Sequence, residues 1–212
     1  MEAPLAVVLS KCVAQAICRQ HALVSESAVH MFKVELRLEE HLAALRRFAL
    51  TDGGDFAAVL ATRLFTLMDV AGPAWLHNDR VNDAMQTALK LSGLDLHPMA
   101  QRVSLRVIPP AEGADAMSLS HLCFDYLVEF PLNVVFHQDA LDKYRRVFVL
   151  LIRVRQVLLA ISRLWSTICA ASRHRHNVHT LSILWHEMHH FCSILQGYLM
   201  SQVLDTSWVE LR

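Results

Sequence analysis

The feature that most constrains this chain is a long stretch, from His137 to about residue 171, in which apolar side chains recur every three or four positions. That spacing matches the 3.6-residue turn of an α-helix and predicts one long helix with a buried side. Asp139 near its start suits the positive end of the helix dipole. The expected buried stripe comprises Leu141, Tyr144, Phe148, Leu151, Leu158, Ile161, Trp165 and Ile168.

The same period predicts further helices before and after this stretch. They are expected over residues 4–20, 25–48, 55–68, from 78 onward, and 178–204. The segment 25–48 is expected to begin at Ser25 or Ser27, whose hydroxyl can cap free N–H groups, and to end before Gly53 and Gly54. In the last helix the residues expected to face inward are Leu181, Leu184, Trp185, Met188, Phe191, Leu195, Tyr198, Leu199 and Val203.

Residues 92–120 differ in character, because glycines and prolines gather there and short alternating runs lie on either side of Pro109 and Pro110. Val103, Leu105 and Val107 alternate with more polar residues, and apolar residues alternate again from Leu122 to Phe130. A period of two is typical of strands. The sequence therefore predicts a mainly α fold, a helical bundle with a small antiparallel β-hairpin.

Composition excludes several classes of function. The 212 residues carry 20 basic and 20 acidic side chains without a basic stripe, so no nucleic acid is expected as a partner. The most apolar segment, residues 147–161, includes Arg153 and Arg155, so it is expected to be a buried core helix and no membrane segment is expected. The five cysteines form no CxxC pair, which favours reduced thiols over a disulfide framework.

One motif favours an enzyme. His186, Glu187 and His190 satisfy H-E-x-x-H, and on a helix the two imidazoles would share a face on which they could bind zinc while the glutamate acts as a general base. The longer form of the motif fails, because Ser193 and Gln196 stand where glycine and a third histidine belong. Apolar residues also interleave the motif. No metal, cofactor or catalytic residue is therefore expected, and the zinc peptidase remains an unfavoured alternative.

The order of several segments resembles the γ-tubulin complex component family in its C-terminal (second Grip) domain. The segments Phe32–Leu36 and Ala44–Phe48, followed by Asp52-Gly53-Gly54-Asp55-Phe56, resemble the family's long helix and its D-G-x-F-A turn. Phe130-Pro131-Leu132-Asn133 resembles the W-P-L-N pattern with Phe in place of Trp, and Leu141, Tyr144 and Phe148 match the helix opening that follows. The end of the chain, from His186 to Trp208, resembles the closing helix and is nearest the component 5 and 6 branch.

This resemblance implies one C-terminal domain over residues 1–212, with the family's N-terminal Grip domain absent from them. It implies binding to γ-tubulin and to other complex components, templating of microtubule nucleation, and a place in the cytoplasm and cytoskeleton at a centrosome or spindle pole. A helical centrosomal scaffold that does not bind γ-tubulin is the alternative. The expected γ-tubulin-binding residues lie around the end of the hairpin and the start of the long helix: Phe130, Asn133, Phe136, His137, Asp139, Lys143, Arg145 and Arg146.

Overall fold

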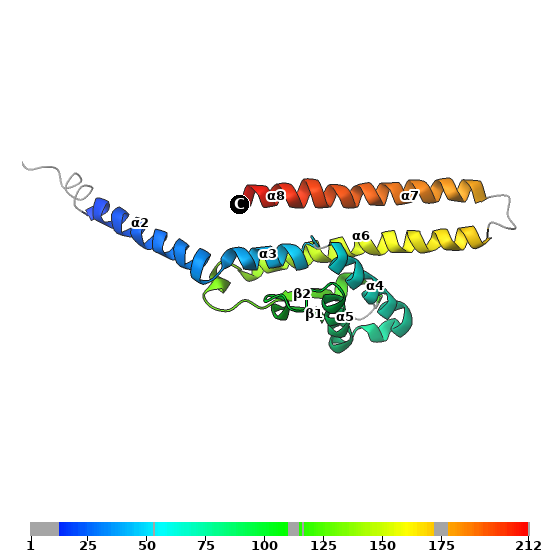
Figure 1. Ribbon diagram of the computed structural model, residues 1–212, viewed down its shortest axis with the longest axis horizontal. Coiled ribbons are helices and arrows are strands. Elements are labelled where there is room, and N and C mark those ends of the chain that lie inside the picture. Colours follow the sequence, from blue (N-terminus) through cyan, green and yellow to red (C-terminus); the bar gives the residue numbers. More distant parts are fainter. Residues whose placement is uncertain (1–12, 53, 110–114, 116, 172–177, 212) are drawn as a thin grey trace, which may run out of the picture.

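The computed structural model describes residues 13–52, 54–109, 115, 117–171 and 178–211, and these form a mainly helical molecule with one two-stranded sheet (Figure 1). The helices are α2 (Gln15–His30), α3 (Leu38–Phe48), α4 (Gly54–Ala71), α5 (Asn78–Leu91), α6 (Gln138–Ala171), α7 (Val178–Tyr198) and α8 (Thr206–Leu211). The strands are β1 (Val103–Val107) and β2 (Leu122–Tyr126). The predicted fold class is confirmed.

The predicted hairpin is present, with β1 and β2 antiparallel and Leu105 opposite Phe124. The alternation in β1 holds, because its first, third and fifth residues are buried and the two between are exposed. The second strand is shorter than predicted and ends at Tyr126, since Leu127 and Phe130 are exposed in the loop that follows. Both strands lie between helices, β1 against α5 and β2 against α6.

Two side chains of α5 accept hydrogen bonds from backbone N–H groups on the outer edge of β1. The backbone N–H groups of Leu105 and Val107 donate to the side-chain oxygens of Asn82 (3.0 Å) and Asn78 (2.7 Å). An edge strand otherwise presents unpaired backbone groups to solvent. The two asparagines therefore fix the register between α5 and the sheet and occupy those edge donors.

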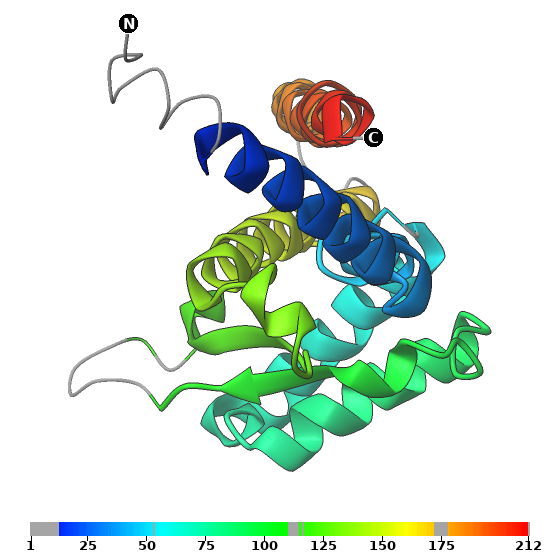
Figure 2. The ribbon, with the colours of Figure 1, turned by 90° about the vertical axis from the view of Figure 1, so that its left-hand side faces the viewer.

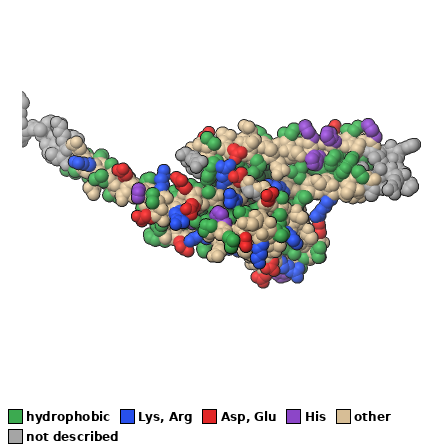
Figure 3. Space-filling model, viewed as in Figure 1, with side chains coloured by type: hydrophobic (Ala, Val, Ile, Leu, Met, Phe, Trp, Pro, Cys, Tyr) green, Lys and Arg blue, Asp and Glu red, His purple; other side chains and the backbone are tan. Residues whose placement is uncertain are grey.

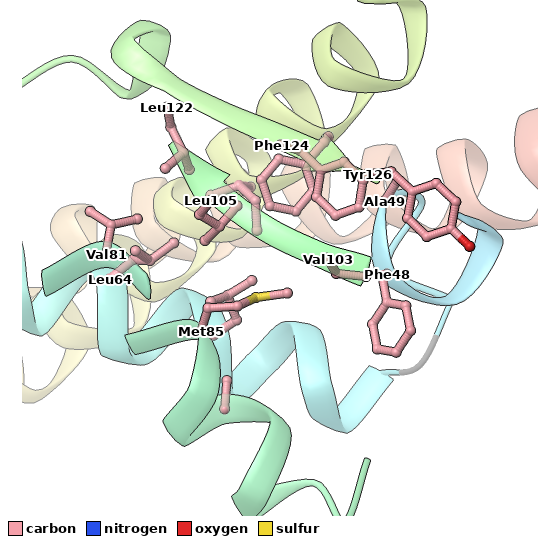
Figure 4. Close-up of a cluster of buried hydrophobic side chains, with 14 of the residues drawn as sticks. Phe48, Ala49, Leu64, Val81, Met85, Val103, Leu105, Leu122, Phe124 and Tyr126 are labelled. Carbon is pink, nitrogen blue, oxygen red and sulfur yellow. The ribbon is translucent and has the colours of Figure 1, made fainter. Parts of the chain in front are cut away.

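The hydrophobic core lies between α3, α4, α5, the sheet and the first half of α6. In Figure 4 the side chains of Phe48, Leu64, Met85, Leu105 and Phe124 converge from α3, α4, α5 and the two strands. Phe48 has no exposed surface and packs edge-on against Phe56, with 5.4 Å between ring centres. Burial of such large apolar side chains is the main stabilising contribution to a domain of this size.

The helix predicted over 25–48 is wrong in two respects. Its expected start at Ser25 or Ser27 lies inside α2, which continues through both residues. It is also interrupted at Arg37, whose φ of 50° and ψ of 44° are left-handed. The carbonyl of Arg37 accepts from the N–H groups of Glu40 and His41, so the residue ends one helical segment and begins α3.

Figure 1 shows α6 and α7 as two long antiparallel rods side by side, which extend together beyond the compact core. Trp165 and Trp185 stack with ring centres 4.4 Å apart, and the Trp185 indole N–H donates to the Ile161 carbonyl at 2.7 Å. Helix α7 continues through a π-helical stretch (Leu199–Asp205) into α8. At that end Arg46 of α3 pairs with Asp205 and lies over the Trp208 ring.

The prediction that the stripe of α7 faces inward is wrong for most of its residues. Six of the nine are exposed: Leu181, Leu184, Met188, Phe191, Tyr198 and Val203. On α6 Trp165 is also 38% exposed, and Ile168 lies outside the residues whose burial is described. Of the predicted helix over 4–20, residues 4–12 lie outside the described part, and Val13 and Ile17 are exposed.

Helix α4 with the turn that follows it, Gly54–Trp75, is the one segment in the described part of the chain that is long and apolar enough to cross a membrane by composition. Its side chains Phe56, Leu60 and Leu64 are fully or almost fully buried in the core. That packing accounts for its high hydropathy, because a core helix of a globular protein meets the same test.

Candidate protein-binding surface

The loop between β2 and α6 presents apolar side chains to solvent. Phe130 is 82% exposed, and Leu127, Val134 and Val135 are exposed in the same loop. We call these four residues the loop patch. A largely exposed phenylalanine beside exposed aliphatic side chains is unusual on a monomer and is typical of a surface that contacts another protein.

Buried residues beneath the loop patch hold it in place. Leu132 and Phe136 are 6% and 5% exposed, and the Phe136 N–H donates to the Leu132 carbonyl at 2.9 Å. The Phe136 ring lies 6.3 Å from that of His41 on α3. The Phe130–Pro131 peptide bond is cis. The loop therefore displays Phe130 outward while its neighbours anchor it to the core.

The structure separates the eight residues predicted for this surface into two groups. Six are exposed around the loop and the first turns of α6: Phe130, Asn133, His137, Asp139, Lys143 and Arg146. The other two serve the fold. Phe136 belongs to the core, and Arg145 is only partly exposed.

Arg145 joins α6 to β2. Its guanidinium donates to the Phe124 carbonyl (3.1 Å), to Asp125 (2.6 Å) and to Asp142. Burial alone would lower the pKa of Arg145, but Cys123, Asp125 and the hydrogen bonds raise it overall, so the side chain stays charged. Asp125 also pairs with Arg106 of β1 at 2.9 Å. Arg145 therefore positions the start of α6 and has few donors left for a partner.

Arg146 is free of this network and borders a hollow of about 460 Å³ between α6 and β2. The hollow is also lined by Arg153 on α6 and by Ile108 and Cys123 at the sheet. Burial raises the pKa of the Cys123 thiol, so the thiol is a poor nucleophile here. The hollow thus adds a cationic margin to the start of α6.

Sequence reasoning missed a buried polar pair beside the loop patch. His41 of α3 and Tyr126 at the end of β2 are 4% and 6% exposed, and the His41 Nδ1 and the Tyr126 hydroxyl oxygen lie 2.7 Å apart. Burial, followed by nearby Arg102, lowers the pKa of His41. Burial raises the pKa of Tyr126 to about 12. The available signal was that His41 interrupts the apolar period of its helix.

The H-E-x-x-H motif lies on an exposed part of α7. The rings of His186 and His190 are 6.2 Å apart, and His189 stacks on Trp185 instead. Across the described residues, no three His, Cys, Asp or Glu side chains come together in a way that could hold a metal ion. Figure 3 shows histidines along the outer surface of this rod, away from the compact core.

Comparison with known proteins identifies relatives along nearly the whole chain. The family described as "Gamma tubulin complex component C-terminal" matches residues 38–212. Mouse γ-tubulin complex component 6 is 32% identical over 98% of this chain, which corresponds to 12% of the mouse protein. Component 3 of Arabidopsis thaliana is 27% identical over 81% of the chain and 22% of that protein.

Spindle pole body component alp6 of Schizosaccharomyces pombe is 25% identical over 87% of the chain and 23% of its own length. The chain thus spans between about one eighth and one quarter of the relatives it matches. The matched region contains both strands, the loop patch and the α6–α7 pair. The chain therefore belongs to the γ-tubulin complex component family, and its residues 38–212 correspond to the C-terminal domain of that family.

Proposed function

We propose that this chain binds γ-tubulin through the loop patch and the exposed start of α6, and so takes part in templating microtubule nucleation. The proposal has two supports. Family membership suggests the complex in which the chain acts, and the 82% exposure of Phe130 suggests where a partner docks. The second is the observation that carries the assignment, because an outward aromatic anchored by a buried neighbour is a common form of interface hot spot.

The surroundings of Phe130 suit a protein partner. Asn133 and His137 can form hydrogen bonds at the rim, and Lys143 and Arg146 add positive charge along the first turns of α6. A stable complex generally buries at least about 1,000 Å² in total. The loop patch alone is too small for that, so the contact is proposed to continue onto α6.

The proposed action is non-covalent. A microtubule nucleus is unfavourable because its first subunits lose translational and rotational freedom before they gain many contacts. A set of components that each hold one γ-tubulin would arrange these subunits before αβ-tubulin arrives. The same proposal places the chain in the cytoskeleton at microtubule-organising centres, in line with the name of the alp6 relative.

The test is equilibrium binding of the purified chain to purified γ-tubulin, measured by biolayer interferometry. Phe130→Ala is expected to weaken binding at least about tenfold, as loss of a central aromatic anchor does. The matched control is Leu96→Ala, because Leu96 is 90% exposed and lies elsewhere. Binding that is equally strong in the wild type and in Phe130→Ala contradicts the proposed surface, and no binding by the wild type contradicts the function.

Arg146→Glu tests the charged margin in the same assay. It is expected to slow association and to reduce the dependence of binding on salt, because rim charges act mainly on the encounter rate. Arg145 is unsuitable for this test, since its reversal would break the contacts to Phe124 and Asp125. A salt dependence identical to that of the wild type would exclude Arg146 from the contact.

A further inference from the structure

A second surface, distinct from the loop patch, lies along the α6–α7 pair. On α7 the exposed apolar residues Leu184, Phe191 and Tyr198 are spaced by seven, with exposed Leu181 and Met188 at the alternate heptad positions. On α6 exposed Leu150, Val157 and Leu164 are also spaced by seven. Each row runs straight along its helix, because seven residues are close to two turns.

Helix geometry places both rows on the same side of the pair. Helix α7 meets α6 through Trp185, and α6 meets α7 through Ile161 and Trp165. At about 100° per residue, each exposed row lies roughly a quarter turn from its contact residues. Because the helices are antiparallel, the two rows fall on one side, which we call the open face: Leu150, Val157, Leu164, Leu184, Phe191 and Tyr198.

The open face points away from the core. In Figure 2, which looks along the pair, the compact core lies below α6 and to its right, and the described helix on the upper left is α2, which leads toward the viewer. The α7 row from Leu181 to Tyr198 is about 26 Å long at 1.5 Å per residue. A length of five turns with a heptad repeat is the geometry that receives an amphipathic helix.

The charges of the open face indicate which kind of helix fits. On α6, exposed Lys143 begins the row that continues with Leu150 and Val157, and exposed Arg146 and Arg153, seven residues apart, form a second row beside it. Among the described residues none of these three cations is in an ion pair. Helix α7 carries Glu187 as its one residue of formal charge between Val178 and Tyr198. The α6 edge is therefore positive and the α7 edge almost uncharged.

We propose that the open face binds an amphipathic helix of a partner protein that carries carboxylates along the edge facing α6. The apolar seam of such a helix would cover Phe191, Leu184 and Val157, and its Glu or Asp side chains would meet Arg153. A second copy of this chain fits less well, because a two-fold contact through this face would set the cationic row against itself.

The test uses the whole chain and two synthetic helical peptides of equal length. Both carry leucine at the two seam positions of each heptad, and one flank is glutamate in the first peptide and lysine in the second. Fluorescence anisotropy is expected to show at least about tenfold tighter binding of the glutamate peptide. Equal binding of the two peptides, or binding of neither, overturns the proposal.

Two variants assign the binding to the open face. Phe191→Ser is expected to weaken the glutamate peptide about tenfold, and Arg153→Glu to remove most of the preference for glutamate over lysine. Arg80→Glu is the matched control, because Arg80 is an exposed cation on α5 outside this face. An effect of Arg80→Glu as large as that of Arg153→Glu would overturn the assignment.

Sedimentation of the chain alone separates the two kinds of occupant. The proposal expects a monomer whose sedimentation is the same in wild type and Phe191→Ser. A dimer that Phe191→Ser dissociates would overturn the choice of a partner helix in favour of a second copy. None of these measurements involves γ-tubulin, so the proposed function and this inference can fail independently.

Discussion

The helices of the core and those of the α6–α7 pair have similar apolar stripes, but the stripes differ in how far they are buried. In the core, the stripe of α4 is buried against α5 and α6, and its Phe56 packs against Phe48 of α3. In the α6–α7 pair, a stripe of the same kind on α7 is mostly exposed, and among the described residues of α7 none is fully buried. The difference teaches that a helical period reveals which side of a helix is apolar, whereas burial depends on whether another element is there to cover it.

The largest effect expected from this contrast comes from a matched pair of phenylalanines. Phe48→Ala in the core is expected to lower the free energy of unfolding by about 3–5 kcal/mol, because it leaves a cavity. Phe191→Ala, at a side chain 66% exposed, is expected to change it by at most about 0.5 kcal/mol. Urea denaturation followed by circular dichroism measures both. Equal losses would mean that α7 is covered in solution.

An intermediate effect is expected for two arginines on α6. Arg145→Ala is expected to cost about 1–3 kcal/mol, since it leaves the Phe124 carbonyl and the Asp125 carboxylate short of a donor. Arg153→Ala, at an exposed cation near the open face, is expected to leave the unfolding midpoint almost unchanged. The same denaturation experiment compares them, and a midpoint as low for Arg153→Ala as for Arg145→Ala would contradict the distinction.

A smaller effect is expected from pH, through two histidines that pack against core side chains. The pKa of His41 is lowered chiefly by burial and secondly by Arg102, and that of His97 by burial and Arg47. Below the ordinary pKa of histidine, the unfolded chain therefore binds more protons at these two residues than the folded chain does. Stability is expected to be complete above the unfolded pKa of about 6.5 and to fall as the pH drops from there toward the lowered folded pKa values.

His41→Gln is the variant that tests this pH dependence. It is expected to lower stability at pH 7, because the bond to Tyr126 is altered, and to flatten the loss between pH 7 and pH 5. An unchanged slope in His41→Gln would remove His41 as the source of the effect.

The smallest effect is expected where the two regions touch through an exposed ion pair. Arg163 of α6 lies 2.7 Å from Asp69 of α4, with side chains 54% and 59% exposed. Exposed pairs of this kind contribute about 0.2–1 kcal/mol. A double-mutant cycle with Arg163→Ala and Asp69→Ala is expected to give a coupling near the bottom of that range, and a larger coupling would show that the regions are joined more firmly.

Much of the fold was predictable from the sequence. The strands around Leu105 and Phe124 and the helices α4 to α7 follow from local periods that tertiary contacts reinforce. The break at Arg37 was not predictable, because an arginine carries no signal for a left-handed backbone. The exposure of the α7 stripe was also not predictable, because it depends on whether another element packs over that side of the helix, and among the described residues none does.

The exposure of most candidate surface residues was predictable, whereas their role in binding stays a prediction. The sequence indicated eight residues between Phe130 and Arg146, and six of these eight are exposed. Whether Phe130 or Phe136 points outward depends on the turn at Leu132, which period alone does not determine. The ion pairs of Arg145 with Asp125 and Asp142 were likewise not predictable, because they depend on how β2 and α6 lie relative to each other.

The stacked indoles of Trp165 and Trp185 give the molecule an internal optical reporter. Two indole rings 4.4 Å apart couple electronically, so the absorption and circular dichroism of this pair depend on the two rods staying together. Trp75, fully buried, reports instead on the core. Unfolding of each half therefore leaves its own spectroscopic trace, and separation of the rods can be followed without attaching any label.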